Sequence, residues 1–119
     1  MSRASRRDKL EAQLRSLESD FRTKLVEELR LCAAGKQGMF AQRDRFYDQL
    51  DDRTRELMSR AEIDLRSRTV EIEHLRAELG YTEPFGLAAR YRAYRDMRGP
   101  NAPGEPKPAK LFLEELGLA

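Results

Sequence analysis

Apolar residues recur every three or four positions over the first 34 residues, which is the spacing of one face of an amphipathic helix. The face consists of Leu10, Leu14, Leu17, Phe21, Leu25 and Cys32. Glu28 occupies a position on this face where an apolar side chain is expected. Ser5 or Asp8 can cap the start, and Gly35 follows the last apolar position as a stop signal. The pattern predicts a helix over about residues 8–34.

A second periodic stretch, free of Gly and Pro, covers residues 39–79. Its stripe reads Phe40, Arg43, Tyr47, Leu50, Thr54, Leu57, Ala61, Leu65, Arg68, Ile72, Leu75 and Leu79. The mean step lies between the coiled-coil and straight-helix values, so a slight left-handed supercoil is expected. One unbroken helix of this length would be roughly 60 Å long. Residues 35–38 contain two glycines and predict a tight turn between the two helices, which makes them an antiparallel hairpin.

Two shorter helical segments are expected after the hairpin. Thr82 as N-cap and Pro84 in the first turn predict a third helix over about residues 83–98. Its apolar face consists of Leu87, Tyr91 and Tyr94. A Pro/Gly linker over residues 99–108 then leads to a short amphipathic segment that ends at Gly117. Because the first helix is shorter than the second, we expect the third helix to fold back over the uncovered C-terminal end of the second.

The predicted fold class is all-α: a long antiparallel helical hairpin with a shorter third helix and a short C-terminal helix after a Pro/Gly linker. The hairpin plus third helix forms a single domain over residues 1–98. The linker and the short C-terminal amphipathic helix occupy residues 99–119. The composition agrees, because 37% of the residues are charged and a long helix needs only one apolar stripe.

The charge balance and the cysteine content limit the classes of function that the chain can have. The 23 basic and 21 acidic residues leave a net charge of +2, which argues against a dedicated nucleic-acid coat. A single cysteine excludes an intrachain disulfide. The N-terminus has no apolar stretch resembling a signal peptide, and no apolar run approaches the roughly 20 residues of a membrane helix. We therefore expect a cytoplasmic protein without membrane contact.

No constellation of catalytic or metal-ligating residues stands out along the chain. Glu71 and His74 have the spacing of half a di-iron motif, but His74 falls almost opposite the apolar stripe and is expected to face solvent. Cys32 lies on the apolar face of the first helix and has no histidine-based triad to activate it, so a core position is expected. We predict no enzyme activity, no cofactor and no metal.

The most concentrated basic and aromatic stretch lies in the third helix. It consists of Arg90, Tyr91, Arg92, Tyr94, Arg95 and Arg98. Such a helix could follow phosphates and stack on bases, which would make it a nucleic-acid-binding site. In the alternative interpretation, the tyrosines pack on the second helix while the arginines pair with Glu71, Glu73 and Glu78. The low net charge favours this structural alternative.

One polar pair is expected inside the hairpin. Glu28 and Arg43 both fall on otherwise apolar stripes, and antiparallel packing across a turn at residues 35–38 would bring them together. A half-buried pair of this kind would fix the register of the two helices.

Two apolar surfaces have no partner within the hairpin. The first is a weaker stripe on the second helix, formed by Ile63, Val70 and Ala77 at intervals of one heptad. Together with the unpaired length of the second helix, it predicts a homodimer. The second surface is the apolar group of the C-terminal segment, which consists of Leu111, Phe112, Leu113 and Leu116. That segment is too short to be a stable helix alone.

The C-terminal apolar group is expected to dock on the weaker stripe of the second helix, in cis or across the dimer, with Phe112 as its anchor. If it does not dock, it becomes the candidate site for a protein partner. The function favoured by these observations is a non-enzymatic interaction or scaffolding protein with an unknown protein partner. The alternative is a nucleic-acid-associated protein that uses the basic and aromatic helix.

Overall fold

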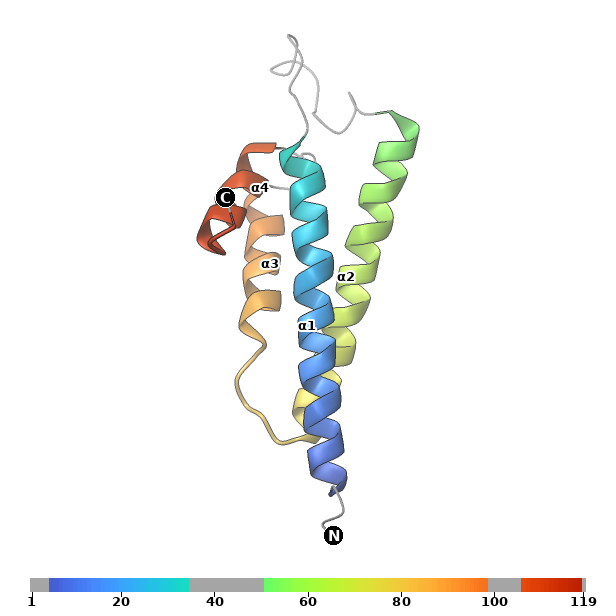
Figure 1. Ribbon diagram of the computed structural model, residues 1–119, viewed down its shortest axis with the longest axis vertical. Helices are drawn as coiled ribbons and strands as arrows, with labels where there is room; N and C mark the ends of the chain where they lie inside the picture. The colour runs from blue at the N-terminus through green and yellow to red at the C-terminus, as the bar shows by residue number, and fades with distance from the viewer. Residues whose placement is uncertain (1–4, 35–50, 99–105, 119) are drawn as a thin grey trace.

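The computed structural model describes residues 5–34, 51–98 and 106–118 of the chain. Within these ranges the backbone forms helices and no strand (Figure 1), which confirms the all-α class. The helices are α1 (Arg6–Ala33), α2 (Asp52–Glu78), α3 (Gly86–Arg98) and α4 (Pro106–Glu115). None of these described helices carries an apolar stretch of the length that a membrane-spanning segment requires.

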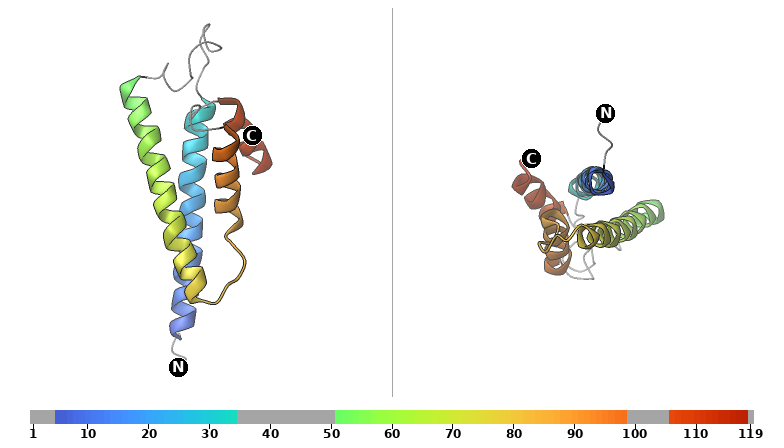
Figure 2. Two further views of the ribbon diagram at one scale, coloured as in Figure 1. Left: turned by 180° about the vertical axis from the view of Figure 1, so that it is seen from behind. Right: turned by 90° about the horizontal axis from the view of Figure 1, so that it is seen from below.

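The four helices form a bundle whose first three members run alternately up and down (Figure 1). Seen along the bundle, α1, α2 and α3 occupy the corners of a triangle, and α4 lies beside α3 on the side away from α2 (Figure 2). α4 packs against both α1 and α3.

Helix α1 is capped by Ser5, one of the two candidates that the sequence offers. The hydroxyl of Ser5 accepts a hydrogen bond from the amide of Asp8 at 3.0 Å, and the Asp8 carboxylate accepts one from the Ser5 amide at 3.3 Å. This reciprocal capping box satisfies two amides that the first helical turn leaves without backbone partners. The buried face of α1 consists of Leu14, Phe21, Leu25, Glu28, Leu29 and Cys32.

Helix α2 starts at Asp52 after a non-helical Asp51, so the predicted helix over residues 39–79 is interrupted there. Its first part and the predicted turn at residues 35–38 lie outside the described residues. Asp51 has extended backbone angles (φ −70°, ψ 162°), and its carboxylate accepts a hydrogen bond from the amide of Thr54 at 2.7 Å. The same hydrogen bond lowers the pKa of the Asp51 carboxyl group. Asp51 is the N-cap of α2. Its carboxylate takes the place of the backbone carbonyl to which the amide of Thr54 would donate in a longer helix.

The C-terminal end of α2 follows the sequence prediction. Gly80 has a positive φ of 82°, a conformation that costs glycine little because it has no Cβ atom. Its amide donates to the carbonyl of Ala77 at 3.0 Å, and the amide of Tyr81 donates to the carbonyl of Arg76 at 2.9 Å. These two bonds form a Schellman motif, which satisfies the last carbonyls of the helix.

The register of α1 against α2 differs from the one that a tight turn requires. A turn at residues 35–38 would place Glu18 level with Arg55, because both helices rise equally per residue. Instead, the carboxylate of Glu18 accepts a hydrogen bond from Arg76 at 2.8 Å. The N-terminal half of α1 therefore covers the C-terminal end of α2, which was expected to depend on the third helix. Arg43 lies outside the described residues, so its pairing with the buried Glu28 stays a prediction.

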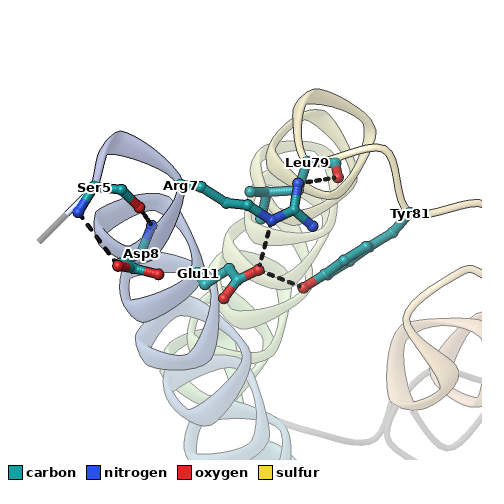
Figure 3. A network of polar contacts seen from close by, with 6 residues as sticks. All are labelled: Ser5, Arg7, Asp8, Glu11, Leu79 and Tyr81. Carbon is teal, nitrogen blue, oxygen red and sulfur yellow. Dashed lines mark hydrogen bonds and ion pairs between the residues drawn. The ribbon is translucent and has the colours of Figure 1, made fainter.

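A polar network joins the start of α1 to the end of α2 (Figure 3). The guanidinium of Arg7 donates to the carboxylate of Glu11 at 3.0 Å and to the carbonyl of Leu79 at 3.2 Å. The hydroxyl of Tyr81 reaches the same Glu11 carboxylate at 3.5 Å. A cation at a helix C-terminus is favourable, because the last carbonyls carry partial negative charge. Together with the Glu18–Arg76 pair, this network holds the two helices in the observed register.

The offset leaves the N-terminal half of α2 partly uncovered. Leu57 was placed on the core stripe, but 46% of its surface is exposed, and its neighbour Met58 is buried instead. Farther along the helix the predicted stripe holds, since Leu65, Ile72, Leu75 and Leu79 are all buried.

Helix α3 begins at Gly86 rather than at residue 83. The carbonyl of Glu83 accepts two hydrogen bonds from the guanidinium of Arg76, at 3.1 and 2.8 Å. That carbonyl is therefore directed toward the end of α2, and the segment containing Thr82 and Pro84 precedes the helix. The predicted Thr82 cap is wrong for this reason. The predicted face is correct, because Tyr91 and Tyr94 are buried.

A chain of aromatic contacts connects three helices through the core. Phe21 of α1 meets the rings of Phe85 and Tyr91 at centroid distances of 5.5 and 6.2 Å. Tyr91 lies 6.3 Å from Tyr94, which lies 5.4 Å from Phe112 of α4. Pairs in this distance range each contribute about 0.5–1.5 kcal/mol beyond the burial of their surface. The aromatic residues of α3 thus link α4 to the hairpin.

The docking site of the C-terminal segment differs from the predicted one. Phe112 is fully buried against α1 and α3, as its role as an anchor requires, but it does not lie on the weaker stripe of α2. On that stripe, Ile63 and Val70 remain 66% and 59% exposed. The competing surface holds Phe112 better because it offers the ring of Tyr94 on one side and the guanidinium of Arg90 at 4.5 Å on the other.

Candidate interaction surface

An open groove of about 790 Å³ runs between α2 and α3. We call it the α2–α3 groove. Its lining consists of Arg66, Thr69, Val70, Glu73, Pro84, Phe85, Ala88, Ala89, Tyr91, Arg92, Ala93, Arg95 and Asp96. Its lining comes from α2, from α3 and from the segment that joins the two helices.

The floor of the groove is apolar because α3 presents small side chains on this side. Ala89 and Ala93 are exposed and one helical turn apart, which keeps the helix backbone accessible from the groove. Alanine favours the helix at both positions without filling the space above it. Val70 of α2 and Phe85 of the connecting segment add apolar surface to the same lining. An apolar floor of this kind favours contact with a complementary apolar surface.

Charged side chains of both signs line the groove on both helices. Arg66 and Glu73 belong to α2, and Arg92 and Asp96 belong to α3. Glu73 has a local role as well, because its carboxylate accepts a hydrogen bond from the amide of Phe85 at 3.3 Å, directly before α3 begins. Within the described parts of the chain, Arg66, Arg92 and Asp96 form no ion pair.

One ion pair joins α2 and α3 at the groove, since its arginine belongs to the lining. The guanidinium of Arg95 on α3 donates to the carboxylate of Glu62 on α2 at 2.7 Å. The same guanidinium lies over the ring of Tyr91 at 5.7 Å. Both side chains of the pair are largely covered, so solvent screens this contact less than it screens a surface pair. Together with the hydrogen bond from Phe85 to Glu73, this pair connects α2 to α3 and to the segment that precedes it.

A smaller groove of about 330 Å³ lies where α1 and α2 diverge. Its lining consists of Lys24, Glu27, Glu28, Leu31, Leu57, Arg60, Ala61 and Asp64. Leu31 and Leu57 are its only large apolar side chains, and charged groups surround them. Residues 35–50, which connect the two helices at this end, lie outside the described residues. The α2–α3 groove is the better defined surface of the two.

The basic and aromatic helix does not present its tyrosines to solvent. Tyr91 and Tyr94 belong to the core, so neither ring can stack on a base in this conformation. Arg95 is engaged by Glu62. The side chain of Arg98 lies outside the described residues, and Arg92 is exposed in the groove wall.

Arg90 binds the C-terminal helix instead of a ligand. Its guanidinium donates two hydrogen bonds to the carboxylate of Glu115, each 2.6 Å long. These hydrogen bonds, and to a smaller extent the attraction between the charges, raise the pKa of Arg90 and lower the pKa of Glu115. Among the described side chains of α3, Arg90, Arg92 and Arg95 form no ion pair with the predicted partners Glu71, Glu73 and Glu78.

The C-terminal apolar group is divided by its docking. Phe112 and Leu113 lie in the core, whereas Leu116 is half-buried and Leu111 is exposed. In this conformation the two core residues are covered and do not offer a surface to a protein partner. Leu111 is the most exposed member of the group, with 46% of its surface accessible.

The remaining sequence candidates lie as their positions on the helices predict. Glu71 and His74 are exposed, and Cys32 is buried in the core. Among residues 5–34, 51–98 and 106–118, no three His, Cys, Asp or Glu side chains converge on a point that could hold a metal ion.

The α2–α3 groove was only half visible in the sequence. Val70 belongs to the weaker stripe that the heptad spacing revealed. Ala89 and Ala93 gave no signal, because small exposed residues are common on helices and their accessibility depends on which helix lies opposite.

Comparisons with known proteins do not assign the chain to a family. No family model matches it, and searches of curated proteins and of solved structures find no match. The interpretation of the groove therefore depends on its geometry and chemistry.

Proposed function

We propose that this chain is a non-enzymatic helical interaction protein and that the α2–α3 groove is its binding surface for a helix of a protein partner. The observation that carries this proposal is the groove itself, which combines an apolar floor with charges of both signs on its two walls. Helix recognition by proteins commonly uses such a groove, in which apolar residues supply affinity and charges set the orientation.

The exposed apolar side chains beside the groove support this proposal. Ile63 and Val70 are both more than half exposed and lie two turns apart on α2. Full burial of such a side chain contributes about 1.5–3 kcal/mol, so covering the exposed part of each would contribute about 1–2 kcal/mol. Two such residues in register give a partner helix a continuous apolar contact.

The state of the basic residues on α3 favours a protein partner over nucleic acid. Nucleic-acid binding by this helix needs unengaged arginines and accessible aromatic rings. Arg90 and Arg95 are paired within the chain, and Tyr91 and Tyr94 are buried. The groove also carries acidic side chains, which would repel phosphates.

A site-specific cross-linker tests the proposal in the native cell. A photo-reactive amino acid at Ala93 would lie in the groove, and the same amino acid at Ser16, on the exposed side of α1, is the matched control. We expect a discrete protein adduct from position 93 and none from position 16. Adducts of equal yield from both positions, or from neither, would contradict a binding role for the groove.

A further inference from the structure

We propose that the occupant of the α2–α3 groove is the α2 helix of a second copy of this chain, docked antiparallel about Val70. This inference rests on the proposed function, since it names the partner of the same groove. Two identical chains related by a twofold axis form a self-complementary interface, in which every contact from one residue to another is repeated in reverse. The described surface has the pattern that this symmetry requires.

The charges on α2 are arranged for such a pairing. Arg66 precedes Val70 by four residues, and Glu73 follows it by three. When two α2 helices cross antiparallel at Val70, Arg66 of each copy lies beside Glu73 of the other. The pairing forms twice, and no like charges meet at these positions. A foreign helix of predominantly one charge would meet as many like charges as opposite ones along the groove.

The apolar residues follow the same symmetry. Val70 of one copy meets Val70 of the other at the axis, and Ile63 lies level with Ala77, because the two are equally far from Val70 in the sequence. A large residue opposite a small one fills the space between two helices without overlap. In this arrangement Ala89 and Ala93 of α3 would contact the side of the second copy's α2.

The available area predicts a dimer of modest stability. α2 has 27 residues and α3 has 13, so together they offer roughly 60 Å of helix with a width of about 10 Å. Each copy can therefore bury at most about 600 Å², or about 1,200 Å² in total, which is the lower end of the range for specific interfaces. We expect a dimer that dissociates on dilution into the micromolar range.

Charge-reversal variants test the pairing. In Arg66→Glu two acidic residues face each other, and in Glu73→Arg two basic residues do, so each variant alone should dimerise at least about tenfold more weakly than the unmodified chain. An equimolar mixture of the two variants should form a heterodimer with both pairs restored. The chain that carries both substitutions should dimerise like the original. Arg22→Glu, on the exposed surface of α1, is the control for the change in net charge.

Sedimentation velocity at increasing concentration measures the dimerisation of each variant, and circular dichroism verifies that each one folds. Because Glu73 also accepts a hydrogen bond from the amide of Phe85, Val70→Glu provides a second test that leaves this bond intact and should also abolish the dimer. A wild-type chain that stays monomeric at about 100 µM, or single variants that dimerise as strongly as the original, would overturn the inference. A monomeric chain that still gives a discrete heterologous adduct from Ala93 would overturn it too, while leaving the proposed function standing.

Discussion

Replacing Phe112 by alanine should release α4 from the bundle. The ring is fully buried, with Tyr94 at 5.4 Å and the guanidinium of Arg90 at 4.5 Å. α4 has ten residues, and an isolated helix of that length is not stable in water. Its order therefore depends on docking, and Phe112 supplies the largest buried side chain of the helix.

The magnitude follows from the burial of the ring. Truncating a core phenylalanine to alanine costs about 3–5 kcal/mol when the element that carries it stays in place. Here α4 can detach from the bundle. The loss in the free energy of unfolding therefore cannot exceed the free energy with which α4 docks. We expect the free energy of unfolding of Phe112→Ala to fall by about 2–4 kcal/mol for this reason. The amides of α4 should lose protection before those of α1 and α2.

Urea unfolding followed by circular dichroism measures the loss, and hydrogen exchange locates it. Leu111→Ala is the matched control, because Leu111 is the adjacent residue and is 46% exposed. Its loss should stay below about 1 kcal/mol, as is usual for surface positions. An equal loss in the two variants, or exchange of the α4 amides at the rate of an unstructured peptide in the unmodified chain, would refute the docking of α4.

Two further predictions concern ion pairs. The side chains of Glu18 and Arg76 are 22% and 15% exposed. A double-mutant cycle with glutamine at each position, measured by urea unfolding, should therefore give a coupling energy of about 1 kcal/mol. Losses that simply add would contradict the pair. The pKa of Glu115 is held below its ordinary value of 4.5 mainly by the hydrogen bond from Arg90. The stabilisation from this depressed pKa is present above pH 4.5 and is lost as the pH falls through the lowered pKa. Titration by NMR should show the pKa returning toward 4.5 in Arg90→Gln, and an unchanged value would contradict the assignment.

Features that depend on a few neighbouring residues could be predicted from the sequence. The Ser5 cap, the stop at Gly80 and the burial of Cys32 each follow from chemistry within one or two helical turns. The all-α class follows in the same way, because the apolar spacing of the first and second helices is continuous over many turns. Most of the buried face of α3 could also be predicted: Tyr91 and Tyr94 are buried and Leu87 is partly buried, whereas the buried Ala88 was not predicted.

The start of α2 could not be read from spacing alone. The apolar stripe continues without a break across Asp51, and an aspartate on the exposed side of a helix looks the same in a sequence as one that caps it. Whether such an aspartate continues the helix or caps it depends on the tertiary contacts of the neighbouring backbone. The spacing also did not predict that α1 covers the C-terminal end of α2, where Glu18 binds Arg76.

The docking of the C-terminal segment illustrates a second limit. Its apolar pattern correctly identifies Phe112 as the anchor, but two surfaces of similar apolar character could receive it. The surface that does so combines Tyr94 with the guanidinium of Arg90, and Arg90 in turn binds Glu115. Such a combination forms only after α1 and α3 have packed. No local feature of either helix distinguishes it from the stripe around Val70.

Arg76 connects the register of the hairpin with the α2–α3 groove. One guanidinium nitrogen binds Glu18 of α1, and two bind the carbonyl of Glu83 in the connection to α3. The first contact holds α1 along the C-terminal end of α2, while the others direct the chain toward the start of α3. Helix α4 packs against α3 on the side away from α2 (Figure 2), and Val70 of α2 stays exposed in the groove between α2 and α3. Because Arg76 holds the connection between the two helices that line the groove, we expect substitution of Arg76 to lower both the free energy of unfolding and the yield of the adduct from position 93.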